Sequence, residues 1–489
     1  MKILVAIASY GTANDPYLAR LVDEYRSMPF DTDIVVLSNV AKAVPADVEL
    51  IVGLPTKNPW SLPFAHKKVF ANRVSKYDVF IYSEDDILIT ENNVRAFLEL
   101  SSRLPAREIP GFLRFEVGRD GKRSYPEFHV NFRWDPNSVR TRNEYTLAFF
   151  TNEHAGCYIL TQTRLQQAID SGGFLVEPHQ GRYDFACSAA TDPYTQCGFE
   201  KVICISHLQD FLVHHLSDKY AGRYGLHESE FHNYVGSLLA SAKNNSAPAP
   251  FNTDSISLSG LFSKNYYEPI RQDLLSLIPD DAKSILSLGC GWGATESHLV
   301  RAGRRVVAVA LDPVMSLWAE SKGVEVAFGD METVRKKLSG ESFDCLLISN
   351  IMHLASDPAK LLSSFTAFLS NTSIVIAAVP NLPPIRVAWK RIHDGQRCRA
   401  LGDFGQTGVH VASHRIIRKW FRHAGFKVEH FVDDVPGRLR LADRLTLGLL
   451  RPLLASEVAV VGRRNQKLQT PAEDSFHSSP AFPESLVQQ

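Results

Sequence analysis

Ser284-Ile-Leu-Ser-Leu-Gly-Cys-Gly-Trp-Gly293 joins a short apolar strand to a turn that carries glycine at every second position. A helical pattern follows from Ala294. Glycines in such a turn let the backbone approach a ligand closely and point the N-terminus of the next helix at it. The stretch therefore predicts a strand–turn–helix unit that binds the ligand of an α/β enzyme.

The residues that follow this turn repeat the alternation of strand and helix. Seven apolar segments read as strands, at residues 284–288, 305–310, 325–328, 345–349, 373–379, 427–431 and 457–462. Helical patterns separate them. Such alternation predicts a doubly wound α/β sheet of seven strands, with its ligand at the carboxyl ends of the strands.

This second half resembles the class I S-adenosylmethionine-dependent methyltransferases. Leu288-Gly-Cys-Gly-Trp-Gly293 is similar to their first motif, and the ends of the next two strands follow at Asp312 and Gly329-Asp330. The resemblance implies S-adenosylmethionine as cofactor, with Gly289, Gly291 and Gly293 against its methionine part. It also implies Asp312 at the ribose and Asp330 at the adenine. O-methylation then needs only a positioned base, for which His353 and His410 are the candidates.

Two positions depart from the pattern of that family. Ser287 stands where the first strand often carries an acidic residue, and Ala310 stands where the acidic residue on the ribose normally falls. Asp312 lies two residues later and reaches the ribose only through a shifted turn. One hydrogen bond to a carboxylate contributes roughly 1.5–3 kcal/mol, so its loss weakens binding about tenfold or more. A fold that no longer methylates is the alternative.

The first half shows its own alternation of strands and helices. Strands are predicted at residues 2–8, 33–37, 79–82, 156–160 and 202–206, and helices at 17–27, 66–74 and 91–100. This pattern predicts a mainly parallel sheet. Residues 119–142 are aromatic and charged without periodicity, and we expect them to form a loop over the site.

Three carboxylates, Glu84-Asp85-Asp86, follow directly after a buried strand. Adjacent carboxylates repel one another, so a cluster at the end of a strand favours a bound cation. A cation there can neutralise a nucleoside diphosphate as leaving group. The alternative is a solvated acidic turn before the helix that starts after Thr90.

This half resembles the glycosyltransferases of the GT-A fold, which carry an Asp-x-Asp motif at a similar place. The resemblance implies a nucleotide-sugar donor held by Mn²⁺ or Mg²⁺, with Asp86 as metal ligand. Glu84 then lies near the ribose or sugar, and Asp85 is a further donor-binding residue. Ser9-Tyr10, at the end of the first strand, lies near the base. The resemblance also implies a histidine ligand from the C-terminal part of this half. The rings of His214 and His215 face opposite sides of a strand, so only one of them can bind the metal, and His215 is the expected one.

The base that activates the acceptor is not fixed by the pattern. Asp184 and Asp192 are the leading candidates, and Glu153 is a third. The side chains of Trp60, Tyr125, Phe132 and Trp134 can stack on sugars, although packing explains each of them as well.

Composition sets the boundaries. A polar segment rich in small residues separates the halves, so we expect a glycosyltransferase-like domain at residues 1–240, an exposed linker at 241–262 and a methyltransferase domain at 263–464. The tail, residues 465–489, is expected to be disordered. The overall class is α/β, with a GT-A-like, Rossmann-like mixed sheet followed by the seven-stranded sheet.

Charge and hydropathy limit the function classes. The chain has 53 basic and 53 acidic residues, which argues against a nucleic-acid partner. Its seven cysteines form no C-x-x-C pair, and no apolar run approaches the roughly 20 residues of a membrane span. We expect a cytoplasmic protein. Residues 436–452 mix arginine and leucine, so they form either an amphipathic helix on a membrane surface or a helix packed on the second sheet.

These patterns lead to one functional hypothesis. The first half transfers a sugar from a nucleotide sugar to a glycan or lipid-linked saccharide acceptor, and the second half O-methylates the glycan. The alternative is a glycosyltransferase whose methyltransferase-like domain is a binding module. A nucleotidyltransferase is disfavoured, because Ser9-Tyr-Gly-Thr-Ala-Asn-Asp15 has no lysine or arginine.

Overall fold

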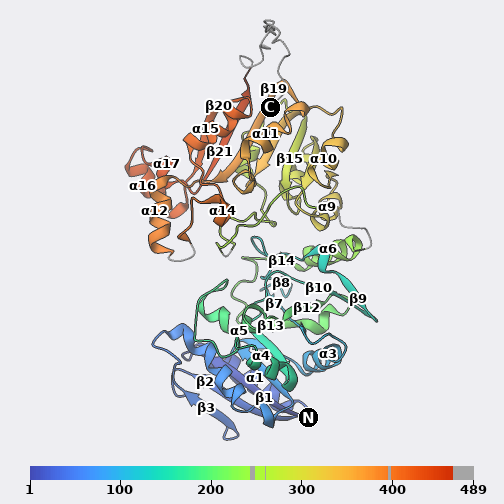
Figure 1. Ribbon diagram of the computed structural model, residues 1–489, viewed down its shortest axis with the longest axis vertical. Coiled ribbons are helices and arrows are strands. Elements are labelled where there is room, and N and C mark those ends of the chain that lie inside the picture. The colour runs from blue at the N-terminus through green and yellow to red at the C-terminus, as the bar shows by residue number, and fades with distance from the viewer. Residues whose placement is uncertain (243–247, 259, 395–397, 466–489) are drawn as a thin grey trace, which may run out of the picture.

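A computed structural model describes residues 1–242, 248–258, 260–394 and 398–465 of the protein. Two α/β halves are stacked along its long axis, with the N-terminal half below and the C-terminal half above (Figure 1). All seven cysteines are free thiols. Within the described ranges, no helix combines the length and the apolar character needed to cross a bilayer.

The first sheet has the order β11-β4-β1-β2-β3. Its bounds are β1 (Lys2–Ser9), β2 (Asp31–Ser38), β3 (Val48–Val52), β4 (Val79–Glu84) and β11 (Cys157–Thr161). The first four strands are parallel, and β11 pairs antiparallel with β4. Residues 3–8 of β1 are all buried, as expected for a parallel strand covered on both faces. The carboxyl ends of β1 and β4 therefore meet at one edge.

Two smaller sheets extend this half toward the C-terminal half. One has the order β6-β12-β10-β9 and the other β14-β8-β7-β13-β5. Their bounds are β5 (Ile87–Leu88), β6 (Glu108–Pro110), β7 (Leu113–Val117), β8 (Arg123–Tyr125), β9 (Arg140–Arg142), β10 (Tyr145–Ala148), β12 (Glu200–Cys204), β13 (Leu212–His215) and β14 (Leu226–His227). The segment 119–142, expected to be a loop, thus contains β8 and β9.

Three helices of the first half begin at a residue whose side chain caps them. The Thr90 side chain accepts from the backbone N–H of Asn93 at the start of α3, as an N-cap residue does. The helices are α1 (Asp15–Ser27), α2 (Ala65–Ala71), α3 (Glu91–Ser101), α4 (Gln162–Asp170), α5 (Phe185–Thr195) and α6 (Glu228–Ser241). A short 3₁₀ helix, η1 (Pro59–Phe64), precedes α2.

The C-terminal sheet has the seven strands that the sequence predicts, in the order β17-β16-β15-β18-β19-β21-β20. Their bounds are β15 (Ser284–Cys290), β16 (Arg305–Ala310), β17 (Glu325–Ala327), β18 (Phe343–Ser349), β19 (Leu369–Pro380), β20 (Phe426–Asp434) and β21 (Glu457–Arg464). Only β21 runs antiparallel to its neighbours. The strand order reverses between β15 and β18, which places a ligand crevice at their carboxyl ends.

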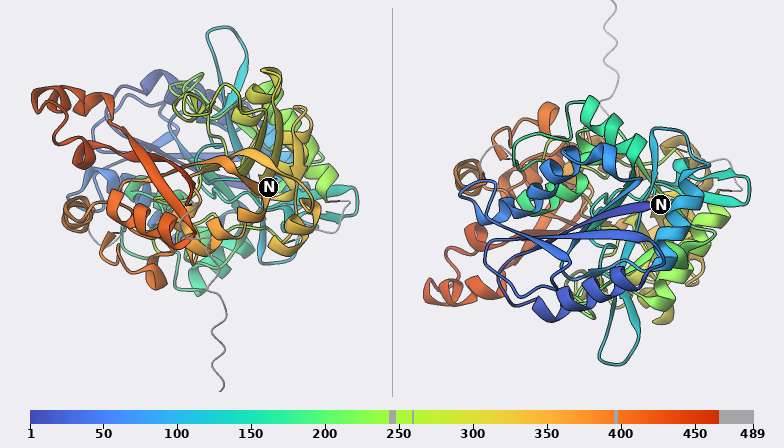
Figure 2. Two further views of the ribbon diagram at one scale, coloured as in Figure 1. Left: turned by 90° about the horizontal axis from the view of Figure 1, so that it is seen from above. Right: turned by 90° about the horizontal axis from the view of Figure 1, so that it is seen from below.

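Helices flank this sheet, and α12, α16 and α17 project from it (Figure 1). The helices are α7 (Gln272–Leu275), α8 (Ala294–Arg301), α9 (Pro313–Glu320), α10 (Met331–Lys337), α11 (Pro358–Ser363), α12 (Pro384–His393), α14 (Phe404–Thr407), α15 (His414–His423), α16 (Arg440–Leu445) and α17 (Arg451–Leu454). Figure 2 shows the red α16–α17 region extending beyond the body of the molecule. Residues 436–452 therefore form two short helices rather than one helix packed on the sheet.

One of the hydrophobic clusters spans the two halves. Helix α6 packs on α9, where the rings of Tyr234 and Trp318 stack with centroids 4.9 Å apart. The backbone N–H of Tyr266 donates to the carbonyl of Val130 at 2.8 Å. Buried apolar residues of both halves form a single cluster around these contacts.

Part of the segment expected to be an exposed linker belongs to this interface. Thr253 and Leu258 are buried, and Asp254 forms an ion pair with Arg133 at 2.7 Å. Small polar residues make such a segment look like a linker, but their hydroxyl and carboxylate groups are bonded here. Residues 243–247 and 259, and the expected disordered tail from residue 466, lie outside the described residues.

Candidate functional sites

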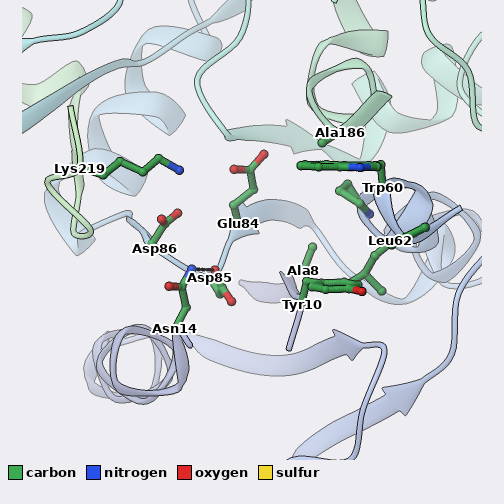
Figure 3. A pocket seen from close by; sticks show the side chains of 12 residues that line it. Ala8, Tyr10, Asn14, Trp60, Leu62, Glu84, Asp85, Asp86, Ala186 and Lys219 are labelled. Carbon is green, nitrogen blue, oxygen red and sulfur yellow. Dashed lines mark hydrogen bonds between the residues drawn. The ribbon is translucent and has the colours of Figure 1, made fainter. Parts of the chain in front are cut away.

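A cavity of about 390 Å³ opens at the carboxyl ends of β1 and β4. Figure 3 shows two kinds of lining at its two ends. The aromatic rings of Tyr10 and Trp60 lie at one end, and Asp86 and Lys219 at the other. Glu84 points into the space between them. The predicted acidic cluster therefore faces a cavity and is not a solvated turn.

Asp86 and His215 meet at this cavity, because β5 pairs antiparallel with β13. The Nε2 atom of His215 lies 3.0 Å from Oδ2 of Asp86, and its Nδ1 atom lies 2.6 Å from Oε1 of Glu116. Burial disfavours the ionised Asp86, but the bond and charge of His215 lower the pKa of Asp86 overall. Burial likewise opposes protonation of His215, and the bonds to Asp86 and Glu116 raise its pKa.

This arrangement is a candidate for part of a metal site. Metal-ligating histidines commonly bond a carboxylate through their other ring nitrogen, as His215 does with Glu116. His214 faces elsewhere and stacks on Phe115 with centroids 4.8 Å apart. In the part of the chain that the structure describes, no three His, Cys, Asp or Glu side chains gather as a complete metal site. A cation at Asp86 and His215 would thus need oxygen ligands from a bound molecule or water.

Asp85 and Ser9 have a positioning role. The hydroxyl of Ser9 donates to Asp85 at 2.6 Å, and the amide of Asn14 donates to the same carboxylate at 2.8 Å. These bonds tie β4 to the end of β1 and to the start of α1. Glu84 is left to face the cavity, and burial, followed by repulsion from Asp86, raises the pKa of Glu84 to about 7.

The Tyr10 and Trp60 rings form a slot for a flat ligand. They lie one above the other across the cavity in Figure 3, and each side chain is more than half exposed. The side chain of Asn58 caps η1 and accepts from the backbone N–H of Trp60, which fixes this turn. Two facing aromatic surfaces separated by a gap favour a planar ring between them.

The candidate acceptor bases are engaged elsewhere. Asp184 caps α5 and accepts from the backbone N–H of Cys187 at 2.8 Å. Asp192 is fully buried in an ion pair with Lys67, so the structure does not support its role as a base for an acceptor. Glu153 pairs with Arg182 at 3.0 Å. The sequence pattern showed carboxylates in loop-rich segments but not these partners.

The glycine turn of the C-terminal half is closely packed. Gly289 and Gly293 have φ of +83° and +77°, and a Cβ atom on Gly291 would lie 2.2 Å from the carbonyl oxygen of Tyr266. The backbone N–H of Trp292 donates to that oxygen at 3.1 Å. The turn therefore requires all three glycines, whereas their contact with a cofactor stays a prediction.

Polar side chains surround a small cavity behind this turn. Arg271, Glu268 and Glu296 line it. The hydroxyl of Ser287 donates to Glu296 at 2.7 Å. A carboxylate from α8 therefore lies beside the position on β15 where the methyltransferase pattern often has an acidic residue. Glu268 accepts from Lys264 at 2.5 Å and Ser349 at 2.8 Å. Sequence reasoning missed Glu268, Arg271 and Glu296, because no motif contains them.

The end of β16 lacks a carboxylate, since Ala310 stands there, and Asp312 caps α9 instead. Its Oδ1 atom accepts from the backbone N–H of Met315 at 2.8 Å. Its Oδ2 atom is buried and has no hydrogen-bond partner among the described residues. Burial raises the pKa of Asp312 to about 6. Asp330 remains exposed at the start of α10, where it accepts from Thr333 at 2.8 Å.

These features fit the polar groups of S-adenosylmethionine at both ends. Arg271 and Glu296 offer partners for an amino acid moiety, and the free Oδ2 atom of Asp312 offers one for a ribose hydroxyl. The cavity itself measures only about 20 Å³. The segment 264–268, whose Tyr266 carbonyl contacts the turn, must therefore shift to admit the ligand.

His353 and His410 do not face this cavity. His353 is buried, with Nε2 2.8 Å from the carbonyl of Phe262, and burial lowers its pKa to about 4. His410 stacks on Phe404 with centroids 4.1 Å apart. The role of His353 as a base stays a prediction, and its buried position beside the Phe262 carbonyl does not support it.

Comparisons with known proteins agree with the fold of this half. Residues 262–431 match the family model described as "Methyltransferase domain". Ubiquinone biosynthesis O-methyltransferases from Cereibacter sphaeroides and Dinoroseobacter shibae are 25% and 30% identical over 117 residues. That segment is 23% of this chain and 47% of each relative, so the chain spans about half the length of the curated relatives it matches.

Methyltransferases of known structure are also similar to this half. An S-adenosylmethionine-dependent methyltransferase from Mesorhizobium loti is 20% identical, with a TM-score of 0.30, over 39% of this chain and 96% of that one. A magnesium protoporphyrin IX methyltransferase from Synechocystis is 14% identical, with a TM-score of 0.27, over 37% and 74%. The C-terminal half contains a methyltransferase-like domain.

Proposed function

We propose that the protein is a bifunctional glycan-modifying enzyme. Its N-terminal half transfers a sugar from a nucleotide sugar with the help of a divalent cation, Mn²⁺ or Mg²⁺. Its C-terminal half transfers the methyl group of S-adenosylmethionine to an oxygen of the glycan. The observation that carries the first activity is the cavity with an aromatic slot at one end and the Asp86–His215 pair at the other.

The residues of this cavity suit the parts of a nucleoside diphosphate sugar. The slot between Tyr10 and Trp60 suits the base, and Lys219 suits a phosphate oxygen. A cation at Asp86 and His215 supplies charge that stabilises the diphosphate as it leaves. Ser9 and Asn14 hold Asp85, and Glu116 orients His215, so the side chains are positioned before a ligand binds.

The C-terminal activity is supported by the glycine turn and by the match to the methyltransferase domain. S-adenosylmethionine supplies an activated methyl group when bound. The glycine backbone, Glu296 and Arg271 would hold its methionine part, and Asp312 its ribose. Tethering of two activities in one chain gives the second enzyme an effective substrate concentration of about millimolar level.

The first activity is tested by screening nucleotide sugars for hydrolysis with and without Mn²⁺. We expect metal-dependent turnover by the parent protein and a loss of about a hundredfold or more in Asp86→Ala, because one ligand of the cation is removed. Asp47→Ala is the matched control: this carboxylate pairs with Arg26 at the surface, outside the cavity lining. Equal turnover by the parent and Asp86→Ala would refute the metal role.

A second candidate is a glycosyltransferase whose methyltransferase-like domain is a binding module. Ala310 at the end of β16 and the cavity of only about 20 Å³ favour this alternative. Isothermal titration of the full chain with S-adenosylmethionine separates the two. Binding that is lost in Gly291→Ala supports the methyl-donor site, whereas the absence of heat with the parent protein supports the binding module.

A further inference from the structure

One surface of the C-terminal half gathers nine of the twenty large hydrophobic side chains that are exposed among the described residues. It is formed by α12 and by residues 436–454, which lie between β20 and β21 and include α16 and α17. Residues of both segments line a shared groove of about 710 Å³. We call these two segments the projecting surface; they lie at the upper left of Figure 1.

Helix α12 presents its apolar stripe to solvent. Ile385, Trp389 and Ile392 are 63%, 55% and 76% exposed. Their spacing of four and three residues places them on one face of the helix. A helix of a soluble domain normally buries such a stripe. In the part of the chain that the structure describes, nothing covers this one.

The α16–α17 segment repeats this feature. Leu441 and Leu445 lie one turn apart and are 68% and 77% exposed. Leu447 and Leu449, in the turn that follows, are 90% and 83% exposed. The buried contacts of this segment come from other side chains, notably Asp443, which pairs with Arg451 at 2.9 Å. These exposed leucines therefore do not stabilise the packing of α16 against α17.

Arginines surround these leucines. Arg438, Arg440 and Arg444 are exposed, and no ion pair is recorded for them within the described residues. Residues 436–454 contain a single carboxylate, that of Asp443. Arg386 on α12 and Arg438 line the same groove, so positive charges of the two segments lie close together. Burial, and then the charge of Arg438, lower the pKa of Arg386.

We propose that the projecting surface docks on a membrane that contains anionic phospholipids. Exposed leucine, isoleucine and tryptophan enter the boundary between headgroups and acyl chains, while arginines contact the phosphates. A second copy of the chain fits less well, because a twofold contact would bring the same unpaired arginines of both copies together. This inference is independent of either proposed activity, and it would place the chain where lipid-linked acceptors reside.

Co-sedimentation of the full chain with lipid vesicles tests the proposal. One set consists of phosphatidylcholine alone, and the other of phosphatidylcholine and phosphatidylserine in equal parts. We expect preferential binding to the second set. Arg440→Ser together with Arg444→Ser should weaken binding by about fivefold per arginine. Leu441→Ser together with Leu445→Ser should also weaken it, because apolar area no longer enters the bilayer.

Matched controls are Leu175→Ser and Arg119→Ser, which replace exposed residues of the N-terminal half. They should bind vesicles like the parent protein, and circular dichroism should show that all variants are folded. Equal binding of the parent to both vesicle sets would overturn the proposal. So would unchanged binding of the arginine and leucine variants, or a dimer in solution that the leucine variant abolishes.

Discussion

Replacement of Asp312 by asparagine should stabilise the protein and weaken its binding of S-adenosylmethionine at the same time. The carboxylate caps α9 through one oxygen, and its other oxygen is buried without a partner. Burial raises its pKa from 3.8 to about 6, which corresponds to ~3 kcal/mol of unfavourable free energy for the ionised form. Asparagine keeps the oxygen that caps the helix and carries no charge.

The sign of this effect depends on pH in a defined way. Well below pH 3.8, Asp312 is protonated in the folded and unfolded states, so the charge has no effect. As the pH rises from about 4 to about 6, the unfolded state ionises more readily, and the folded state loses stability relative to it. The gain from Asp312→Asn should therefore be about 3 kcal/mol near pH 7.5 and roughly half of that near pH 5.

Urea unfolding followed by tryptophan fluorescence measures this gain. Asp357→Asn is the matched control, because Asp357 caps α11 by accepting from the backbone N–H groups of Ala359 and Lys360. Its effect should be small at both pH values. A gain from Asp312→Asn that is the same near pH 5 and pH 7.5, or a loss of stability near pH 7.5, would refute the reasoning. Calorimetry should show that Asp312→Asn binds S-adenosylmethionine at least about tenfold more weakly than the parent protein does.

Three further outcomes are expected. Tyr234→Ala removes the ring that stacks on Trp318 between the halves, so the midpoint of thermal unfolding should fall with a loss of about 3–5 kcal/mol; an unchanged midpoint would contradict a shared core. Lys67→Ala leaves Asp192 buried without this lysine, so the free energy of unfolding measured in urea should fall by about 3–5 kcal/mol; a fall of less than about 1 kcal/mol would show that the pair is solvated. Trp60→Ala should lower the affinity for a nucleoside diphosphate, measured by titration, about tenfold without changing the stability of the protein; unaltered affinity would rule out the stacking slot.

The sheet of the C-terminal half was predictable because its strands are continuous apolar runs with glycine turns between helices. Residues 284–288 and 305–310 appear as strands with nearly the predicted bounds. The smaller strands of the first half were missed, since β8 and β9 have three residues each. Strands this short depend on pairing with distant segments, which local patterns do not reveal.

The candidate sites were predictable only where the backbone dictates them. Asp86 and His215 lie 129 residues apart in the sequence, yet the pairing of two strands brings them together. Both residues stand at the ends of apolar strands, and this pattern is visible in the sequence. Asp192 shows the limit, because its lysine partner lies 125 residues away on α2. A carboxylate in an active site and a carboxylate in a buried ion pair have the same local sequence pattern.

A crystal structure grown with S-adenosylhomocysteine, Mn²⁺ and uridine diphosphate tests the two-site proposal most directly. We expect density for Mn²⁺ between Asp86, His215 and the diphosphate, and a base between Tyr10 and Trp60. The nucleoside of the second ligand should lie on the 289–293 turn, with residues 264–268 displaced from it. Density for neither ligand at these two places, at saturating concentrations, would contradict the proposal.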